Sequence, residues 1–120
     1  MLFRSMYKQR SMLKTKLCDA ACLMLPAIDE LGDEIARMDA LDLFEIEGFA
    51  EQLEEFEDSL ASLANSIRAL DKTVVRTDSD LLALNSRVAA CQTGMKSLVN
   101  RVSSYPAHVM SLIQIGRAHV

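Results

Sequence analysis

A repeat of apolar side chains runs through the second half of the chain, and it constrains the fold more than any other feature. From residue 49 to residue 105, core-type residues follow one another at alternating steps of four and three. They are Phe49, Leu53, Phe56, Leu60, Leu63, Ile67, Leu70, Val74, Thr77, Leu81, Leu84, Val88, Cys91, Met95, Leu98, Val102 and Tyr105. A heptad pattern this long is typical of a left-handed coiled coil.

We expect this repeat to form one helix over residues 49–106. At about 1.5 Å per residue the helix would be roughly 85 Å long, which is too long for a compact domain. It is expected to stop at Tyr105-Pro106, because the residue before a proline is pushed out of the α region and Ser103-Ser104 weakens the last turn. Residues 107–113 would then be a tail.

The first third of the chain has the same rhythm, at Leu17, Ala21, Met24, Ile28, Leu31, Ile35 and Met38. Pro26 lies inside it, so a helix is expected either to begin there or to kink there. Between Met38 and Phe49 the register slips, and we favour a hinge at 42–48 over a continuous helix. The predicted fold is therefore all-α and elongated, with a short N-terminal helix in segment 6–41 and one long coiled-coil helix.

The two ends of the chain, residues 1–5 and 114–120, match translated sequencing-adapter DNA read on opposite strands. We expect the natural protein to cover about residues 6–113, and we do not take Met1 as its start. Without Arg4 and Arg117 the basic residues fall from 13 to 11 against 17 acids, so the formal charge moves from -4 to -6.

Composition narrows the class of protein. The acidic balance gives no general reason to bind nucleic acid. The longest apolar stretch, near residues 20–28, is too short to span a bilayer and contains Pro26. Three cysteines without framework spacing indicate a reducing compartment. We therefore expect a cytoplasmic protein.

Charge is arranged in blocks along the sequence. Residues 8–16 carry only basic charge, whereas residues 29–58 carry thirteen acids against Arg37. A basic segment near the N-terminus could touch an anionic membrane or belong to a mitochondrial presequence, but such a run is more often the solvated face of a helix. Membrane contact is expected to be peripheral or indirect at most.

The positions that flank the heptad core indicate the kind of partner. In a self-pairing parallel coil they would pair opposite charges, but here they are mostly neutral or acidic on one side only. Small Ala and Ser residues around 59–66 would let a third or fourth helix approach. We therefore predict a hetero-oligomer with other coiled-coil proteins, rather than a homodimer, with the heptad positions as the partner-helix interface. Thr77 would either fix the register of that interface or only bond the carbonyl four residues earlier.

The residue types needed for catalysis or metal binding are sparse. Cys18 and Cys22 could share a helix face, but two thiols are half a zinc site. Cys91 falls at a core position, and His108 and His119 are the only histidines. There is no Gly-rich phosphate loop and no Ser/His/Asp set. We expect no enzymatic activity, no cofactor and no metal.

Three short motifs point to a family. Arg87-Val88-Ala89 precedes an aromatic-proline pair, Tyr105-Pro106, and the stretch 20–26 reads Ala-Ala-Cys-Leu-Met-Leu-Pro. With these motifs the chain resembles the cappuccino family, subunit 4 of the biogenesis-of-lysosome-related-organelles complex, most clearly over 70–106 and more loosely over 20–106. The resemblance implies an elongated heteromeric complex that sorts cargo on endosomal membranes, and it carries over no catalytic residue.

The expected function is a non-enzymatic coiled-coil subunit of a hetero-oligomeric scaffold, in traffic from endosomes to lysosome-related organelles. The alternatives are a SNARE-like fusion helix and a structural coiled coil of the cytoskeleton or kinetochore. The SNARE-like alternative is disfavoured because Thr77 takes the central layer, where Gln or Arg would be expected, and no C-terminal anchor follows.

Overall fold

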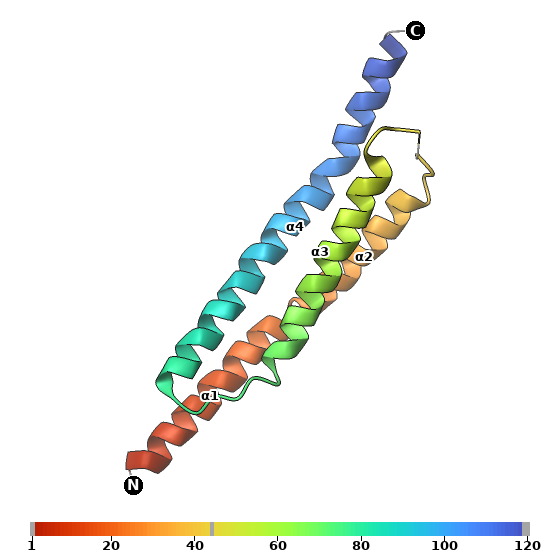
Figure 1. The fold of residues 1–120 in the computed structure, drawn as a ribbon. Coiled ribbons are helices and arrows are strands. Elements are labelled where there is room, and N and C mark those ends of the chain that lie inside the picture. The colour runs from red at the N-terminus through yellow and green to blue at the C-terminus, as the bar shows by residue number, and fades with distance from the viewer. Residues whose placement is uncertain (1, 44, 119–120) are drawn as a thin grey trace.

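The chain folds into helices that lie alongside one another. The computed structural model describes residues 2–43 and 45–118, with side chains for 8–43 and 45–114. The described residues form α1 (Leu2–Cys22), α2 (Leu25–Asp39), α3 (Phe49–Leu70) and α4 (Asp78–Ala118). Only Leu23 and Met24 separate α1 from α2, so the architecture is a three-helix arrangement in which the first helix is bent (Figure 1). The molecule is a rod with extents of 78 × 19 × 17 Å.

The prediction of one long helix over residues 49–106 is wrong. Helix α3 ends at Leu70 and α4 begins at Asp78, and the chain reverses between them so that α3 and α4 pack antiparallel. The connector, residues 71–77, has the length of one heptad. The apolar repeat therefore stays in phase across the reversal, which makes two helices look like one in the sequence. The fold is all-α and somewhat elongated, but it consists of helices packed against each other.

Thr77 and Asp80 define the start of α4. The backbone N–H of Asp80 donates to Thr77 Oγ1 at 3.1 Å, and the backbone N–H of Thr77 donates to Asp80 Oδ2 at 3.2 Å. Asp80 Oδ2 also accepts from the backbone N–H of Arg76 at 3.0 Å. Because the first N–H groups of a helix lack intrahelical partners, this capping box favours a helix start here. Thr77 is exposed at this cap, so it is not a polar core layer as predicted.

Two side chains tie the turn to its surroundings. Arg87 Nη1 donates to Thr73 Oγ1 at 2.9 Å, which links α4 to the connector. Arg10 of α1 lies 3.8 Å from the carboxylate of Asp78 at the start of α4. Both contacts are exposed, so their contribution to stability is small, but they join the turn to two helices.

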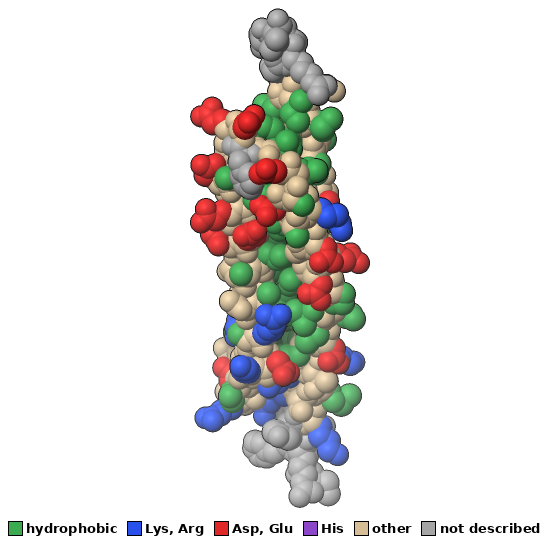
Figure 2. Space-filling model, turned by 90° about the vertical axis from the view of Figure 1, so that its right-hand side faces the viewer, with side chains coloured by type: hydrophobic (Ala, Val, Ile, Leu, Met, Phe, Trp, Pro, Cys, Tyr) green, Lys and Arg blue, Asp and Glu red, His purple; other side chains and the backbone are tan. Residues whose placement is uncertain are grey.

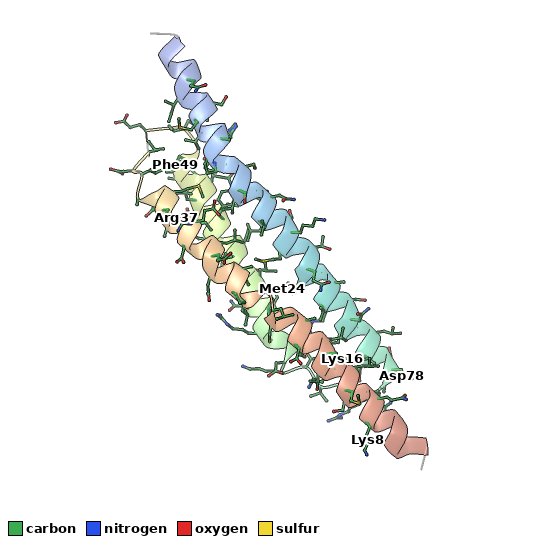
Figure 3. All side chains as sticks on the ribbon, turned by 180° about the vertical axis from the view of Figure 1, so that it is seen from behind. Lys8, Lys16, Met24, Arg37, Phe49 and Asp78 are labelled. Carbon is green, nitrogen blue, oxygen red and sulfur yellow. The ribbon has the colours of Figure 1, made fainter. Side chains whose placement is uncertain are left out.

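The bend between α1 and α2 redirects the chain from one neighbour to another. Helix α2 has Pro26 in its first turn, where the missing N–H has no intrahelical partner in any case. Figure 3 shows Met24 at the bend. Helix α1 packs mainly against α4, whereas α2 packs mainly against α3. One bent helix therefore covers parts of both other helices.

Residues 40–48 connect α2 to α3, where the sequence predicts a hinge at 42–48. Gly48 precedes α3 with φ of 81°, a left-handed conformation that glycine adopts without a steric penalty. Leu43 and Ile46 of this connector pack against the core, so this loop is anchored by apolar contacts.

Helix α4 continues through Pro106 to Ala118, so the predicted stop at Tyr105-Pro106 and the predicted tail over 107–113 are wrong. A proline inside a helix loses one backbone hydrogen bond and costs about 3 kcal/mol. Here the apolar face continues past it, since Val102 and Val109 are buried and Ile113 packs against the core. Tertiary burial on both sides of Pro106 offsets the local penalty. The side chains of the expected adapter segments, 1–5 and 114–120, lie outside the described residues except for Gln114.

Charge separates along the rod. The acidic block, residues 29–58, covers α2, its connector and the first half of α3, whereas the basic block, residues 8–16, lies on α1 near the α3–α4 turn. Figure 2 shows acidic side chains gathered over the upper part of the visible face, whereas the lower part carries most of the basic ones together with several acids. Figure 3 places Lys8 and Lys16 towards the end where Asp78 lies, whereas Phe49, at the start of α3, lies towards the opposite end.

Replacing Thr77 by Ala should lower the free energy of unfolding by about 1 kcal/mol, because the first turn of α4 loses its cap. Urea unfolding monitored by circular dichroism measures this loss in the free energy of unfolding. Thr93→Ala, at an exposed position within α4, is the matched control and should cause no loss. Equal effects of the two substitutions would contradict the capping role.

The cap should also respond to pH. The backbone N–H groups of Arg76 and then Thr77 hold the pKa of Asp80 below its ordinary value of 3.8. A carboxylate with a lowered folded-state pKa contributes stability that is fully present above its unfolded pKa and is lost as pH falls through the folded pKa. The Asp80→Asn variant should therefore have a lower melting temperature than the natural chain at neutral pH. This difference in melting temperature should shrink below pH 3.8. Melting curves recorded from neutral pH to below pH 3.8 measure this difference. A difference that does not vary with pH would count against the capping role of the Asp80 carboxylate.

Candidate functional site

Most of the predicted partner-helix interface lies in the core of this chain. The buried positions are Phe49, Leu53, Phe56, Ile67, Leu70, Leu84, Val88, Cys91, Met95, Leu98 and Val102. Leu60, Leu63, Leu81 and Tyr105 are half-buried, and Val74 and Thr77 are exposed in the turn. The helices that cover this stripe in the structure belong to the same chain. A contact between these residues and a different protein stays a prediction.

An aromatic cluster joins the start of α3 to α4. The ring of Tyr105 stacks on Phe49 with centroids 6.1 Å apart and meets Phe56 edge-on at 5.5 Å. Burial, and secondarily the charge of Glu51, raise the pKa of the Tyr105 phenol above its ordinary value. The sequence predicts all three as core positions, but their contact depends on the reversal of the chain.

Arg101 crosses from α4 to α3 beside this cluster. Its guanidinium lies over the ring of Phe56, 5.5 Å from the centroid, and forms an ion pair with Glu55. Both charged side chains are partly exposed, so salt screens the ion pair. Arg101 therefore carries positive charge at the surface between the two helices.

A groove runs along α3 and α4 and has a volume of about 580 Å³. We call it the α3/α4 groove. It is lined by Asp58, Ser59, Ser62, Leu63, Ser66, Ala90, Cys91, Gly94, Ser97, Leu98 and Arg101. The sequence signal for this groove is the group of small Ala and Ser residues around 59–66, which predicts room for a further helix.

The cysteines take separate places. Cys18 is buried, and its thiol donates to the carbonyl of Leu70 at 3.6 Å, which links α1 to the end of α3. Burial raises the pKa of this thiol. Cys22 is exposed and Cys91 is buried. Within the described residues no three or more His, Cys, Asp and Glu side chains are grouped to hold a metal ion. Across the same part of the chain, none of the helices combines the length and apolar character that crossing a membrane requires.

Several large apolar side chains lie on the surface, and only one of them belongs to the heptad stripe. More than half of each is exposed: Met12, Leu23, Leu41, Val74, Leu82 and Met110. Leu23 at the α1–α2 bend is 80% exposed and Leu82 on α4 is 69% exposed. Apart from Val74 these residues lie off the repeat, so heptad reasoning does not find them.

Comparisons with protein-family models, with curated proteins and with solved structures gave no match to this chain. Its function is therefore inferred from its own fold and surface.

Two valines of the predicted interface provide a matched test of the corrected fold. Val88 is 3% exposed, and Val88→Ala should lower the free energy of unfolding by roughly 2 kcal/mol, because it removes buried methyl groups. Val74 is 63% exposed in the turn, and Val74→Ala should change the free energy of unfolding by less than about 0.5 kcal/mol. Chemical denaturation of both variants measures the difference. Similar large losses at both positions would instead fit a continuous helix.

Proposed function

We propose that this chain is a non-enzymatic subunit of a hetero-oligomeric helical scaffold. The observation that carries the proposal is the amount of surface that the rod leaves uncovered. Its accessible surface is 8507 Å² for 13.3 kDa, whereas a compact monomer of this mass exposes about 6,500 Å². A rod of packed helices presents long lateral faces, and such faces suit assembly with other helical proteins.

The exposed leucines support the same conclusion. Burying the side chain of a leucine is worth roughly 1.5–3 kcal/mol, and Leu23 and Leu82 lose most of that burial in the isolated chain. A partner that covers them would recover this free energy. We propose that unlike helical chains bind over these two side chains.

The proposed setting is the cytoplasmic face of endosomes, in traffic towards lysosome-related organelles. It rests on the resemblance to the cappuccino family. Arg87-Val88-Ala89 and Tyr105-Pro106, two of the motifs that carry the resemblance, both lie in α4, and residues 20–26 lie at the α1–α2 bend.

The SNARE-like alternative loses its support in this fold. It requires Thr77 to be the central layer of an extended helix, but Thr77 is exposed and caps α4 at a reversal of the chain. No feature of the described residues favours a cytoskeletal or kinetochore role.

The test is co-purification of the tagged full chain from its source cells, followed by size-exclusion chromatography and mass spectrometry. We expect other small helical proteins to co-elute at fixed stoichiometry and to co-fractionate with endosomal membranes. The double substitution Leu23→Gln with Leu82→Gln should reduce partner recovery severalfold, because the partner loses apolar contact. Lys16→Gln with Asn85→Gln, at exposed positions in α1 and α4, is the matched control and should retain the partners.

Elution of the chain without any stoichiometric partner would reject the scaffold role. Partners that are retained by the leucine variant would reject Leu23 and Leu82 as the contact. A stable complex that never co-fractionates with endosomes would reject the trafficking setting and leave the scaffold role standing.

A further inference from the structure

The α3/α4 groove is lined by residues of α3 and α4 alone, so α1 and α2 do not cover it. Its floor contains the apolar side chains of Leu63, Cys91 and Leu98. Gly94 lies at its centre and is exposed. A Cβ atom added at Gly94 would meet Leu63 Cδ1 at 3.6 Å, which is ordinary contact. The packing of α3 on α4 therefore does not require glycine there.

The two rims of the groove carry opposite charge. Asp58 on the α3 side and Arg101 on the α4 side are the charged residues that line the groove. Glu55 and Arg87 lie outside this lining, Glu55 paired with Arg101 and Arg87 bonded to Thr73 of the connector. Glu55 and Arg101 form an ion pair, so they lie at the same height along the rod. A surface with one acidic rim and one basic rim is complementary to a copy of itself.

We propose that the α3/α4 groove is a self-association surface, and that a second copy of this chain occupies it with the two rods parallel. A two-fold axis along the rod places α3 of each chain opposite α4 of the other. Asp58 of one chain then lies near Arg101 of its partner copy, and the same contact recurs on the other side of the axis. Complementary rims fix the orientation of such a dimer.

An antiparallel orientation centred on Gly94 is disfavoured by the arginines of α4. Arg87 and Arg101 lie seven residues on either side of Gly94. If the copies stacked antiparallel about Gly94, Arg87 of each chain would face Arg101 of the other. Like charges placed together across an interface are strongly unfavourable. Of these two arrangements, the parallel one places Asp58 near Arg101 of the other copy.

The available area suits a weak, reversible dimer. The 22 residues of α3 span about 33 Å. With a rod width of 19 Å, the shared face covers roughly 600 Å² on each chain, or roughly 1,200 Å² for both. That is the lower end of the range for specific interfaces. The inference goes beyond the proposed function, because Leu23 and Leu82, the proposed contacts with unlike chains, do not line the groove.

The test is analytical ultracentrifugation of the full chain over a wide concentration range. We expect the natural chain to pass from monomer to twice its mass of 13.3 kDa as concentration rises. Asp58→Arg and Arg101→Glu should each weaken the dimer at least tenfold, because each puts like charges across the interface. An equimolar mixture of the two variants should recover the dimer, because each restores the complement of the other. Glu57→Arg and Lys96→Glu, which do not line the groove, are the matched controls and should dimerise normally.

Because Arg101 also contacts Glu55 and Phe56, a second variant avoids disturbing the fold. Gly94→Gln fills the groove while favouring the helix, so it should be monomeric with undiminished helicity. Thr93→Gln, the neighbouring exposed position, should dimerise. A natural chain that stays monomeric, a dimer that none of these variants weakens, or a mixture that fails to recover would each overturn the proposal. None of these outcomes affects the co-purification of unlike partners through Leu23 and Leu82.

Discussion

The reciprocal hydrogen bonds between Thr77 and Asp80 cap the start of α4, and the contacts between α4 and α3 follow from the reversal of the chain just before it. Because α4 begins at Asp78 after a turn, its far end runs back beside the start of α3. Tyr105 can then pack against Phe49 and Phe56, residues about fifty positions earlier in the chain. The ion pair between Arg101 and Glu55 has the same origin.

The heptad repeat predicts which side of each helix is buried, but it does not show that the chain reverses. Leu53 and Val88 are core residues in the sequence pattern and in the structure. The reversal is hidden because residues 71–77 take up one heptad, so Leu70 and Leu84 keep the same phase. The available signal is the run Thr77-Asp78-Ser79-Asp80 before two leucines, a capping-box pattern that marks a helix start. Apolar periodicity alone cannot distinguish a continuous helix from two helices joined by a turn of heptad length.

Local sequence signals fail at Pro106, but they do indicate the α3/α4 groove. Proline is a strong local stop signal, but the buried contacts of Val102 and Val109 lie on both sides of it and keep α4 helical. Such contacts come from packing, which local preference does not include. The small residues around 59–66 do predict open space beside α3, since their size follows directly from their identity. The residues opposite them, among them Gly94, become part of that space only through the reversal.

The division of charge along the rod determines the electrostatic potential that a neighbouring surface or protein meets at each end. At physiological ionic strength the Debye length is about 8 Å, a small fraction of the 78 Å length of the rod. The acidic end and the basic end are therefore screened from each other. A nearby surface or protein meets the local potential of one end, and the formal net charge of -4 describes neither of them.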